Sequence, residues 1–243
     1  DYVPFCGAPP LPADLWLRWT LDPWLLSGLA LAALAGCRLE ADRQRFAYAW
    51  ALVAVLFVSP LCAASMALFS ARVGQHILLT LVAAPVLAAA LPRMRLPALP
   101  LAVVFAALFW GWHAPVPYAA TLASDAGYWA MHLSLFASAT LLFAAMRARV
   151  HRALGAAALT GTQLTIYATL LTLSDAPWHA WHLATTEPYG LTALGDQQLA
   201  GAMMWVAGGA LFLTFVGTQA ARFLRESDPE PRPSAARLSR NDT

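Results

Sequence analysis

Long apolar blocks alternate along the chain with short polar breaks, most of which contain arginine. A helix needs about 20 apolar residues to cross a bilayer, and several of the blocks approach or exceed that length. The pattern predicts an all-α fold, a polytopic membrane bundle of seven transmembrane helices. The predicted spans are residues 22–37, 46–64, 70–91, 97–114, 126–146, 153–174 and 198–220.

The arginine residues predict how this bundle is oriented. The breaks "CRLEADRQR" (37–45), "PRMRLP" (92–97) and "RARVHR" (147–152), with the segment after Gly217, hold thirteen of the fifteen cationic side chains. These segments fall on every second connection and at the C-terminus. The positive-inside rule therefore places them in the cytoplasm and the N-terminus outside.

The composition supports a membrane protein: 60% of the residues are hydrophobic and 12% are charged. Soluble proteins carry about twice that share of charge. We expect residues 1–225 to form the seven-helix transmembrane domain and residues 226–243 to form a disordered cytoplasmic tail. The net charge of +2, without a basic patch interleaved with aromatic residues, predicts no nucleic-acid partner. Cys6, Cys37 and Cys62 are scattered, and their spacing predicts neither a disulfide framework nor a thiolate metal site.

Three histidines fall inside consecutive predicted spans on the outer side. His76, His113 and His132 lie at similar depths if each residue rises by about 1.5 Å along its helix. Short connections join these spans, so we expect the three rings to face a common point. A single intramembrane histidine is as often a hydrogen-bonding residue between helices, but three at matched depth favour a shared site.

The other histidines have simpler interpretations. His179 and His182 occur with Trp178 and Trp181 in the predicted outer loop, where interfacial anchoring is favoured over metal binding. His151 lies in a cytoplasmic run of arginines, as a solvated loop residue does.

The outer start of the last span carries the remaining polar and sulfur-containing candidates. Asp196 and Met203 are seven residues apart and share a helix face, as do Gln197 and Met204, and Gln198 follows directly. Imidazole with thioether suits copper, and a three-histidine site also allows zinc. Hard cations would need more carboxylates than this region provides. The alternative for the two methionines is ordinary packing.

Two further polar residues lie at the outer start of the third span. Gln75 directly precedes His76, and Arg72 lies one helical turn before it. We expect Arg72 to extend its charge towards the outer interface, as long cationic side chains do near helix ends. Pairing with Asp196, or with an acidic group of a partner, is the alternative.

Four segments in this order resemble the CtaG family of cytochrome c oxidase assembly factors. The first combines Ser-Pro-Leu, Phe-Ser, Gln-His and Ala-Pro; the others contain Trp-His-x-Pro, a further histidine, and Asp-Gln-Gln before Met-Trp. The segments are "SPLCAASMALFSARVGQHILLTLVAAPVLAAALP" (59–92), "WHAPVPY" (112–118), "MHLSLF" (131–136) and "GLTALGDQQLAGAMMW" (190–205).

The resemblance implies a multi-pass protein of the bacterial plasma (inner) membrane that helps to assemble haem–copper oxidases of the caa3 type. It implies copper delivery to the oxidase catalytic centre, with the oxidase core subunit as partner and another copper chaperone as a further candidate partner. Whether the chain forms a homodimer stays open. Members often carry a further histidine where this chain has Arg72, whose charge would disfavour a bound cation. The site residues carried over by motif are His76, His113, His132, Asp196, Gln197 and Gln198.

The leading hypothesis is a non-enzymatic assembly protein that holds copper in the outer half of the membrane and passes it to the oxidase. One alternative is a membrane redox protein with two of the histidines on a haem, which is disfavoured because only Arg18 and Arg72 lie outside to pair with propionates. The other is a metal-free scaffold or accessory subunit. The candidate metal ligands are His76, His113, His132, Met203 and Met204, and the surrounding or partner-contacting residues are Gln75, Arg72, Asp196, Gln197 and Gln198.

Overall fold

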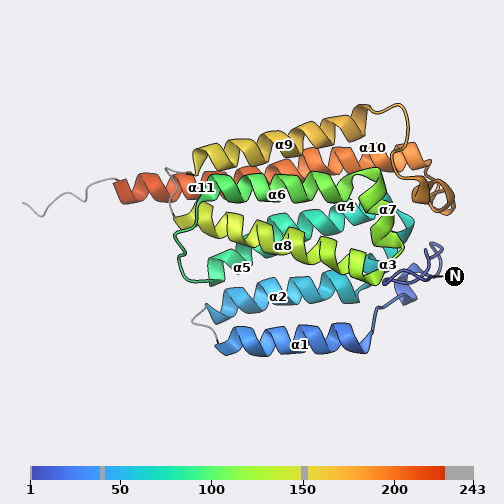
Figure 1. Cartoon of the computed structure of the whole chain (residues 1–243), viewed down its shortest axis with the longest axis horizontal. Helices are drawn as coiled ribbons and strands as arrows, with labels where there is room; N and C mark the ends of the chain where they lie inside the picture. The colour runs from blue at the N-terminus through green and yellow to red at the C-terminus, as the bar shows by residue number, and fades with distance from the viewer. Residues whose placement is uncertain (1, 39–41, 149–152, 228–243) are drawn as a thin grey trace, which may run out of the picture.

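The computed structural model describes residues 2–38, 42–148 and 153–227, and every regular element within these ranges is a helix. His151 and nearly all of the predicted tail, 226–243, lie outside the described residues. The main helices form a bundle in which most of them run side by side along the longest axis of the molecule, while the segment Pro115–Leu122 lies across one end (Figure 1). They are α1 (Pro23–Arg38), α2 (Arg43–Val58), α3 (Pro60–Ala67), α4 (Phe69–Leu78), α5 (Ala84–Ala90), α6 (Ala98–His113), α7 (Pro115–Leu122), α8 (Asp125–Ala148), α9 (Leu154–Leu173), α10 (Ala193–Met203) and α11 (Gly209–Ser227).

Four continuous helical segments are long and apolar enough to cross a membrane: Phe69–Ala90, Asp125–Ala148, Leu154–Leu173 and Ala193–Arg225. Two bent helix pairs, α2 with α3 and α6 with α7, raise this number to six if each pair counts as one span. The shorter apolar helix Pro23–Gly36 corresponds to the first predicted span. The chain is thus an all-helical membrane protein within the described ranges, while seven crossings and the orientation of the termini stay predictions.

Prolines cause the two bends. The chain turns by 52° between α2 and α3 and by 71° between α6 and α7, and Pro60 and Pro115 begin the second helix of each pair. A proline lacks the backbone N–H that a continuing helix needs, but it is well suited to the first turn of a new helix. The helix in the span predicted for residues 46–64 is therefore broken at Ser59.

Side-chain caps begin two of the helices. The side chain of Asp22 accepts a hydrogen bond from the Leu25 N–H at 2.9 Å, immediately before α1. The Ser124 hydroxyl accepts one from the Gly127 N–H at 2.9 Å, immediately before α8. Each side chain satisfies an N–H group that the first helical turn leaves free.

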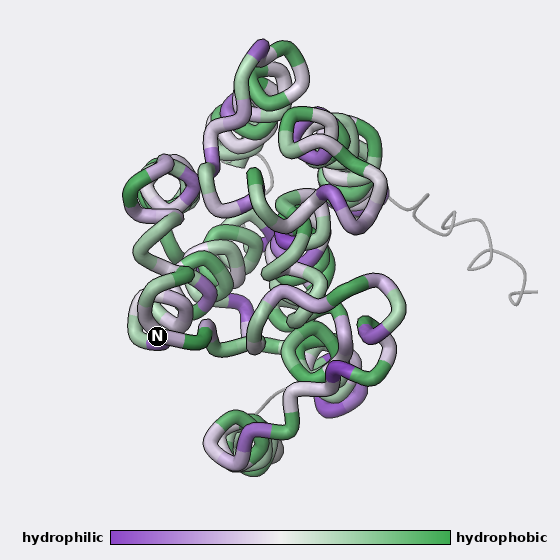
Figure 2. Tube along the Cα trace, turned by 90° about the vertical axis from the view of Figure 1, so that its right-hand side faces the viewer, coloured by the Kyte–Doolittle hydropathy of each residue, from purple (hydrophilic) through white to green (hydrophobic). Residues whose placement is uncertain are grey.

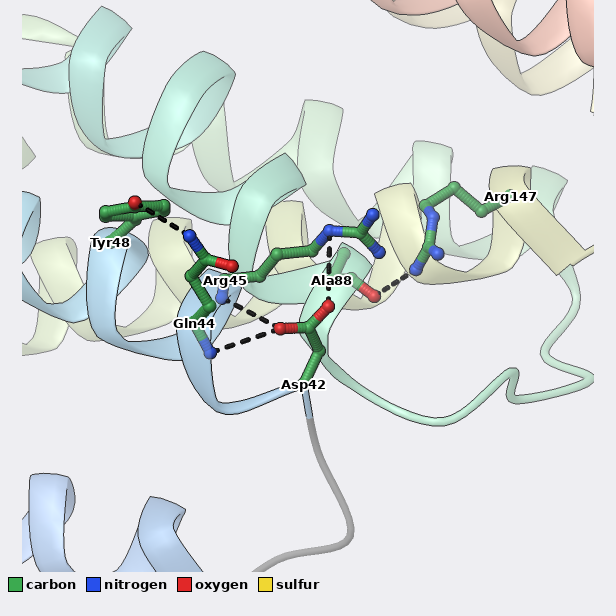
Figure 3. Close-up of polar contacts among 6 residues, drawn as sticks. All are labelled: Asp42, Gln44, Arg45, Tyr48, Ala88 and Arg147. Atoms are coloured by element: carbon green, nitrogen blue, oxygen red, sulfur yellow. Dashed lines mark hydrogen bonds and ion pairs between the residues drawn. The ribbon is translucent and has the colours of Figure 1, made fainter.

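One end of the bundle gathers arginines from separate breaks in the sequence (Figure 3). Asp42 caps α2 by accepting hydrogen bonds from the backbone N–H groups of Gln44 and Arg45, both at 3.1 Å, and its second oxygen pairs with Arg45 Nε at 3.5 Å. Arg147, at the end of α8, donates to the carbonyl of Ala88 in α5. Arginines of two predicted cytoplasmic breaks thus meet at the same end, as the predicted orientation requires.

The opposite end holds a disulfide between Cys6 and Cys62, whose sulfur atoms are 2.00 Å apart. The spacing of the cysteines did not indicate this bond. The N-terminal segment folds across the α2–α3 bend, where the Thr20 N–H donates to the Val58 carbonyl at 2.9 Å, and this brings together two cysteines 56 positions apart. Disulfides persist in oxidising compartments, so this bond agrees with an outer location for this end.

Helix α1 lies at the edge of the bundle, at the bottom of the end-on view (Figure 2). It packs tightly against α2 at Gly36, where an added Cβ would come within 1.8 Å of the Phe46 ring. At Gly28, two turns earlier, an added Cβ would meet no atom within 4 Å. The small residues of α1 therefore allow close packing at one end of the helix only, and the functional candidates lie deeper, around α4.

Candidate functional site: a buried histidine cluster

The position of α4 depends on a carboxylate from α10. Asp196 accepts hydrogen bonds from the backbone N–H groups of Phe69 at 2.6 Å and Ser70 at 3.2 Å, and also from the Ser70 hydroxyl. Its side chain is fully buried. The first N–H groups of a helix lack intrahelical partners and carry partial positive charge, so a carboxylate satisfies both needs. Asp196 therefore fixes the start of the helix that carries Arg72, Gln75 and His76, and it does not pair with Arg72.

The structure brings His76, His113 and His132 into direct contact. Nδ1 of His76 lies 3.1 Å from Nε2 of His113, and Nε2 of His76 lies 3.2 Å from Nε2 of His132. The residues come from α4, α6 and α8, and none is more than 5% exposed. Rings of Phe57 and Phe109 pack against His132 and His113, with centroids 5.1 and 4.5 Å away. The cluster is therefore a polar site enclosed by aromatic side chains.

The three neutral rings of this cluster have one N–H group too few to form a hydrogen bond at each of their contacts. Nδ1 of His113 faces the Phe109 carbonyl at 2.7 Å, and Nδ1 of His132 faces the Tyr128 carbonyl at 2.9 Å. A carbonyl oxygen only accepts, so we assign the N–H group of each ring to Nδ1 and a lone pair to Nε2. Both lone pairs then face His76, whose neutral ring has one N–H for two contacts. A proton or a metal ion would satisfy the second contact.

The spacing of these nitrogens is close to what one metal ion requires. Two nitrogen ligands at about 2.0–2.1 Å from an ion lie roughly 3.3–3.6 Å apart, slightly more than the two N···N distances here. His76 presents a different nitrogen to each neighbour, however, so the three rings do not yet surround one point. Accordingly, no three His, Cys, Asp or Glu side chains in the described ranges are already arranged to hold a metal. Binding would require the His76 ring to turn.

Arg72 lies one helical turn from His76 and is fully buried. The expectation that its charge reaches the outer interface is therefore wrong. Its guanidinium donates to the Ser65 carbonyl at 3.3 Å and the Thr121 hydroxyl at 3.2 Å, and it lies 5.2 Å from the centroid of the Tyr118 ring. Among the described residues the one ion pair joins Arg45 to Asp42, so neutral groups hold the Arg72 charge. A buried positive charge held in this way opposes a second cation nearby.

Other predicted site residues support the helices around the cluster. Gln75 is buried, and its amide donates to the Leu56 carbonyl at 2.8 Å. Gln197 accepts from the Trp178 N–H at 2.7 Å, which ties the loop before α10 to that helix, while Gln198 is partly exposed. The terminal methyl of Met203 lies against α4, where an added Cβ at Gly74 would approach it to 3.1 Å. These contacts place none of the four residues in the histidine cluster.

Met204 lies on a cavity of about 730 Å³ that reaches His76 and His113. The walls come from α4, α6, α9 and α11 and from two π-helical turns, η2 (Leu79–Ala83) and η6 (Met204–Gly208). Its rim includes Leu154 and Leu213, which are 70% and 69% exposed, so it opens on the side of the bundle. On the far side His132 lines a second cavity of about 340 Å³ next to α1. The histidine cluster thus lies between two apolar cavities.

The outer-loop histidines are buried, which the favoured anchoring interpretation did not predict. His179 and His182 are 5% and 2% exposed. The loop folds inwards over α3 and α7: Trp181 Nε1 donates to the Met66 carbonyl at 2.8 Å, and the Tyr118 hydroxyl lies 2.7 Å from Nε2 of His182. Sequence spacing gave no signal for Tyr118, which joins this loop to Arg72.

Residues 95–226 match the family model described as cytochrome c oxidase caa3 assembly factor, Caa3_CtaG. The match covers more than half of the chain. The chain belongs to this family. The matched part of this CtaG-family protein includes His113, His132 and Asp196 but begins after α5, so His76 and Arg72 lie outside it. No curated protein and no solved structure matches the chain. Membership points to a role in oxidase assembly rather than catalysis.

Replacing Asp196 with alanine should destabilise the protein, because it leaves the buried N–H groups of Phe69 and Ser70 without an acceptor. We expect the free energy of unfolding to fall by about 1–3 kcal/mol. Thermal unfolding of the detergent-purified protein, followed by circular dichroism, measures this. Asp22→Ala is the matched control, since it removes a cap from the peripheral helix α1 and should cost less. Equal unfolding midpoints for Asp196→Ala and the wild type would show that this carboxylate does not hold α4.

Proposed function

We propose that this CtaG-family protein binds copper through His76, His113 and His132 and passes it to a haem–copper oxidase. The observation that carries the proposal is the pair of N···N contacts, 3.1 and 3.2 Å long, that join three buried imidazoles with too few protons between them. A bound cation would give a partner to the imidazole lone pair that lacks a proton. The family supplies the context, since a cytochrome c oxidase needs copper during assembly.

The chemistry of the cluster favours copper over the alternatives. Imidazole nitrogens bind copper tightly, and Met204 on the adjoining cavity adds a soft thioether within the same region. A haem between two of the rings is disfavoured because the rings touch each other and leave no gap for a porphyrin. A metal-free scaffold would not need the unmatched lone pairs that face His76.

The buried charge of Arg72 suits a protein that gives its metal away. A unit charge one helical turn away weakens cation binding by on the order of 2 kcal/mol at the effective dielectric of a protein interior. Copper would therefore be held by strong ligands against an opposing charge. This balance favours transfer over permanent retention.

The large cavity offers a lateral route for the transfer. It runs from His76 and His113 to the exposed side chains of Leu154 and Leu213, between helices apolar enough to lie in a bilayer. The oxidase core subunit would receive copper at this side, within the plasma membrane, after another chaperone or free copper has loaded the site. Handover in the plane of the membrane keeps the ion out of bulk solvent.

The direct test is the copper content of purified protein. The wild type should retain about one copper ion per chain after loading, and His76→Ala with His132→Ala should retain almost none, because two of the three imidazoles are gone. His151→Ala is the control, since it removes a histidine from the arginine-rich break. Elemental analysis measures the copper, and thermal unfolding checks that each variant is folded. Equal copper in the folded double variant and the wild type would refute direct binding by the cluster.

The lateral route predicts that filling the cavity blocks transfer but not binding. Gly209 lines the cavity, and a side chain added there would meet no atom within 4 Å, so Gly209→Phe should fold and occupy the space. Gly217→Phe is the matched control, because this glycine of the same helix is equally open but does not line the cavity. We expect less copper in the co-expressed oxidase with Gly209→Phe only. Equal oxidase copper with both variants would exclude this route.

A further inference from the structure

A second histidine site lies in the loop that covers the outer end of the bundle. His179 is 5% exposed, and neither of its ring nitrogens has a hydrogen-bond partner among the described residues. Buried polar side chains are nearly always hydrogen-bonded, so a histidine left in this way needs an explanation. The proposed copper cluster does not include it, and its place in the fold suggests a separate task.

The surroundings hold the His179 ring in one position. The ring stacks on Tyr118 with centroids 4.0 Å apart, and the Phe69 ring lies 4.7 Å away on another side. The backbone before it is fixed by the 2.7 Å hydrogen bond from the Trp178 N–H to Gln197. The backbone after it is fixed by Thr185, whose hydroxyl donates to the Ala67 carbonyl at 2.6 Å. These contacts and hydrogen bonds therefore fix the position of the His179 ring.

His182 differs from its neighbour in having both ring nitrogens engaged. Its Nδ1 faces the Ala67 carbonyl at 3.3 Å and is therefore assigned the N–H group, while Nε2 accepts from the Tyr118 hydroxyl at 2.7 Å. His182 thus holds the hydroxyl of the same tyrosine on which His179 stacks. Of the two outer histidines, only His179 has a lone pair that no described protein group uses.

His179 is neutral at physiological pH and lies in the loop between α9 and α10. Burial, followed by the nearby charges of His182, His113 and Arg72, lowers the pKa of His179 to about 3. Tyr167 packs between this loop and the cluster, 5.5 Å from the His113 ring and 5.7 Å from that of Trp178.

We propose that His179 is an outer ligand that captures copper(I) and passes it inwards to the cluster of His76, His113 and His132. Copper(I) needs few ligands and binds soft donors or imidazole. One fixed imidazole with a free lone pair can therefore bind it transiently. This inference rests on the proposed copper function, because it assigns the loading step of that same site. Tyr118 and His182 act as positioning residues that hold His179 in place.

The test measures how fast copper(I) loads, and not only how much is bound. The metal-free protein is mixed with copper(I) held by a coloured chelator, and the loss of colour reports the transfer rate. His179→Phe keeps an aromatic ring on Tyr118 but removes both nitrogens, so loading should slow roughly tenfold or more while the final copper content stays at the wild-type level. His179→Met supplies a thioether instead and should recover much of the rate.

The two variants separate a ligand from a packing residue. If His179 only fills space, Phe should load as fast as the wild type and Met should be the slower variant, and this outcome would overturn the inference while leaving the copper cluster in place. Thermal unfolding shows whether each variant is folded. If His179→Phe does not fold, the loading rate of His179→Met still distinguishes a ligand from a packing residue. A wild type that takes up no copper(I) would overturn the proposed function itself, and this inference with it.

Discussion

The carboxylate of Asp196 on the first N–H groups of α4 is the interaction on which the rest of the site depends. It joins α10 to α4, two helices more than a hundred residues apart in the sequence, through two backbone hydrogen bonds and the Ser70 hydroxyl. α4 in turn carries Arg72, Gln75 and His76 on its inner surface. Placing α4 against α6 and α8 is what brings His76 to His113 and His132. Asp196, which was predicted to lie beside the metal ligands or to contact a partner, thus holds in place the helix that carries His76.

The site itself combines features that would each be costly alone. Buried imidazoles normally find hydrogen-bond partners, and buried charges normally find counter-ions. Here two of the imidazole lone pairs face a ring with one proton to share, and the neighbouring Arg72 is held by neutral groups among the described residues. Under the proposed function, nitrogens that can bind a cation lie beside a charge that repels one, and this combination predicts a site of intermediate affinity. Such a balance fits a membrane protein that belongs to a family of oxidase assembly factors.

Much of this arrangement follows from simple features of the sequence. Apolar block length predicts most of the long helices. The helix rise and the short connections between spans are enough to predict that His76, His113 and His132 meet. What the sequence could not predict depends on how distant segments fold onto each other. The Cys6–Cys62 bond needs the N-terminal segment to cross the α2–α3 bend, and the burial of His179 needs the loop before α10 to fold over α3 and α7.

The most direct measurement is the X-ray absorption spectrum of the copper-loaded protein. Binding by the cluster predicts imidazole nitrogens as the main neighbours of copper, at about 2.0 Å, and the loss of this signal when His113 is replaced by alanine. A first shell made mainly of sulfur, at about 2.3 Å, would place the metal elsewhere on the chain and contradict the account.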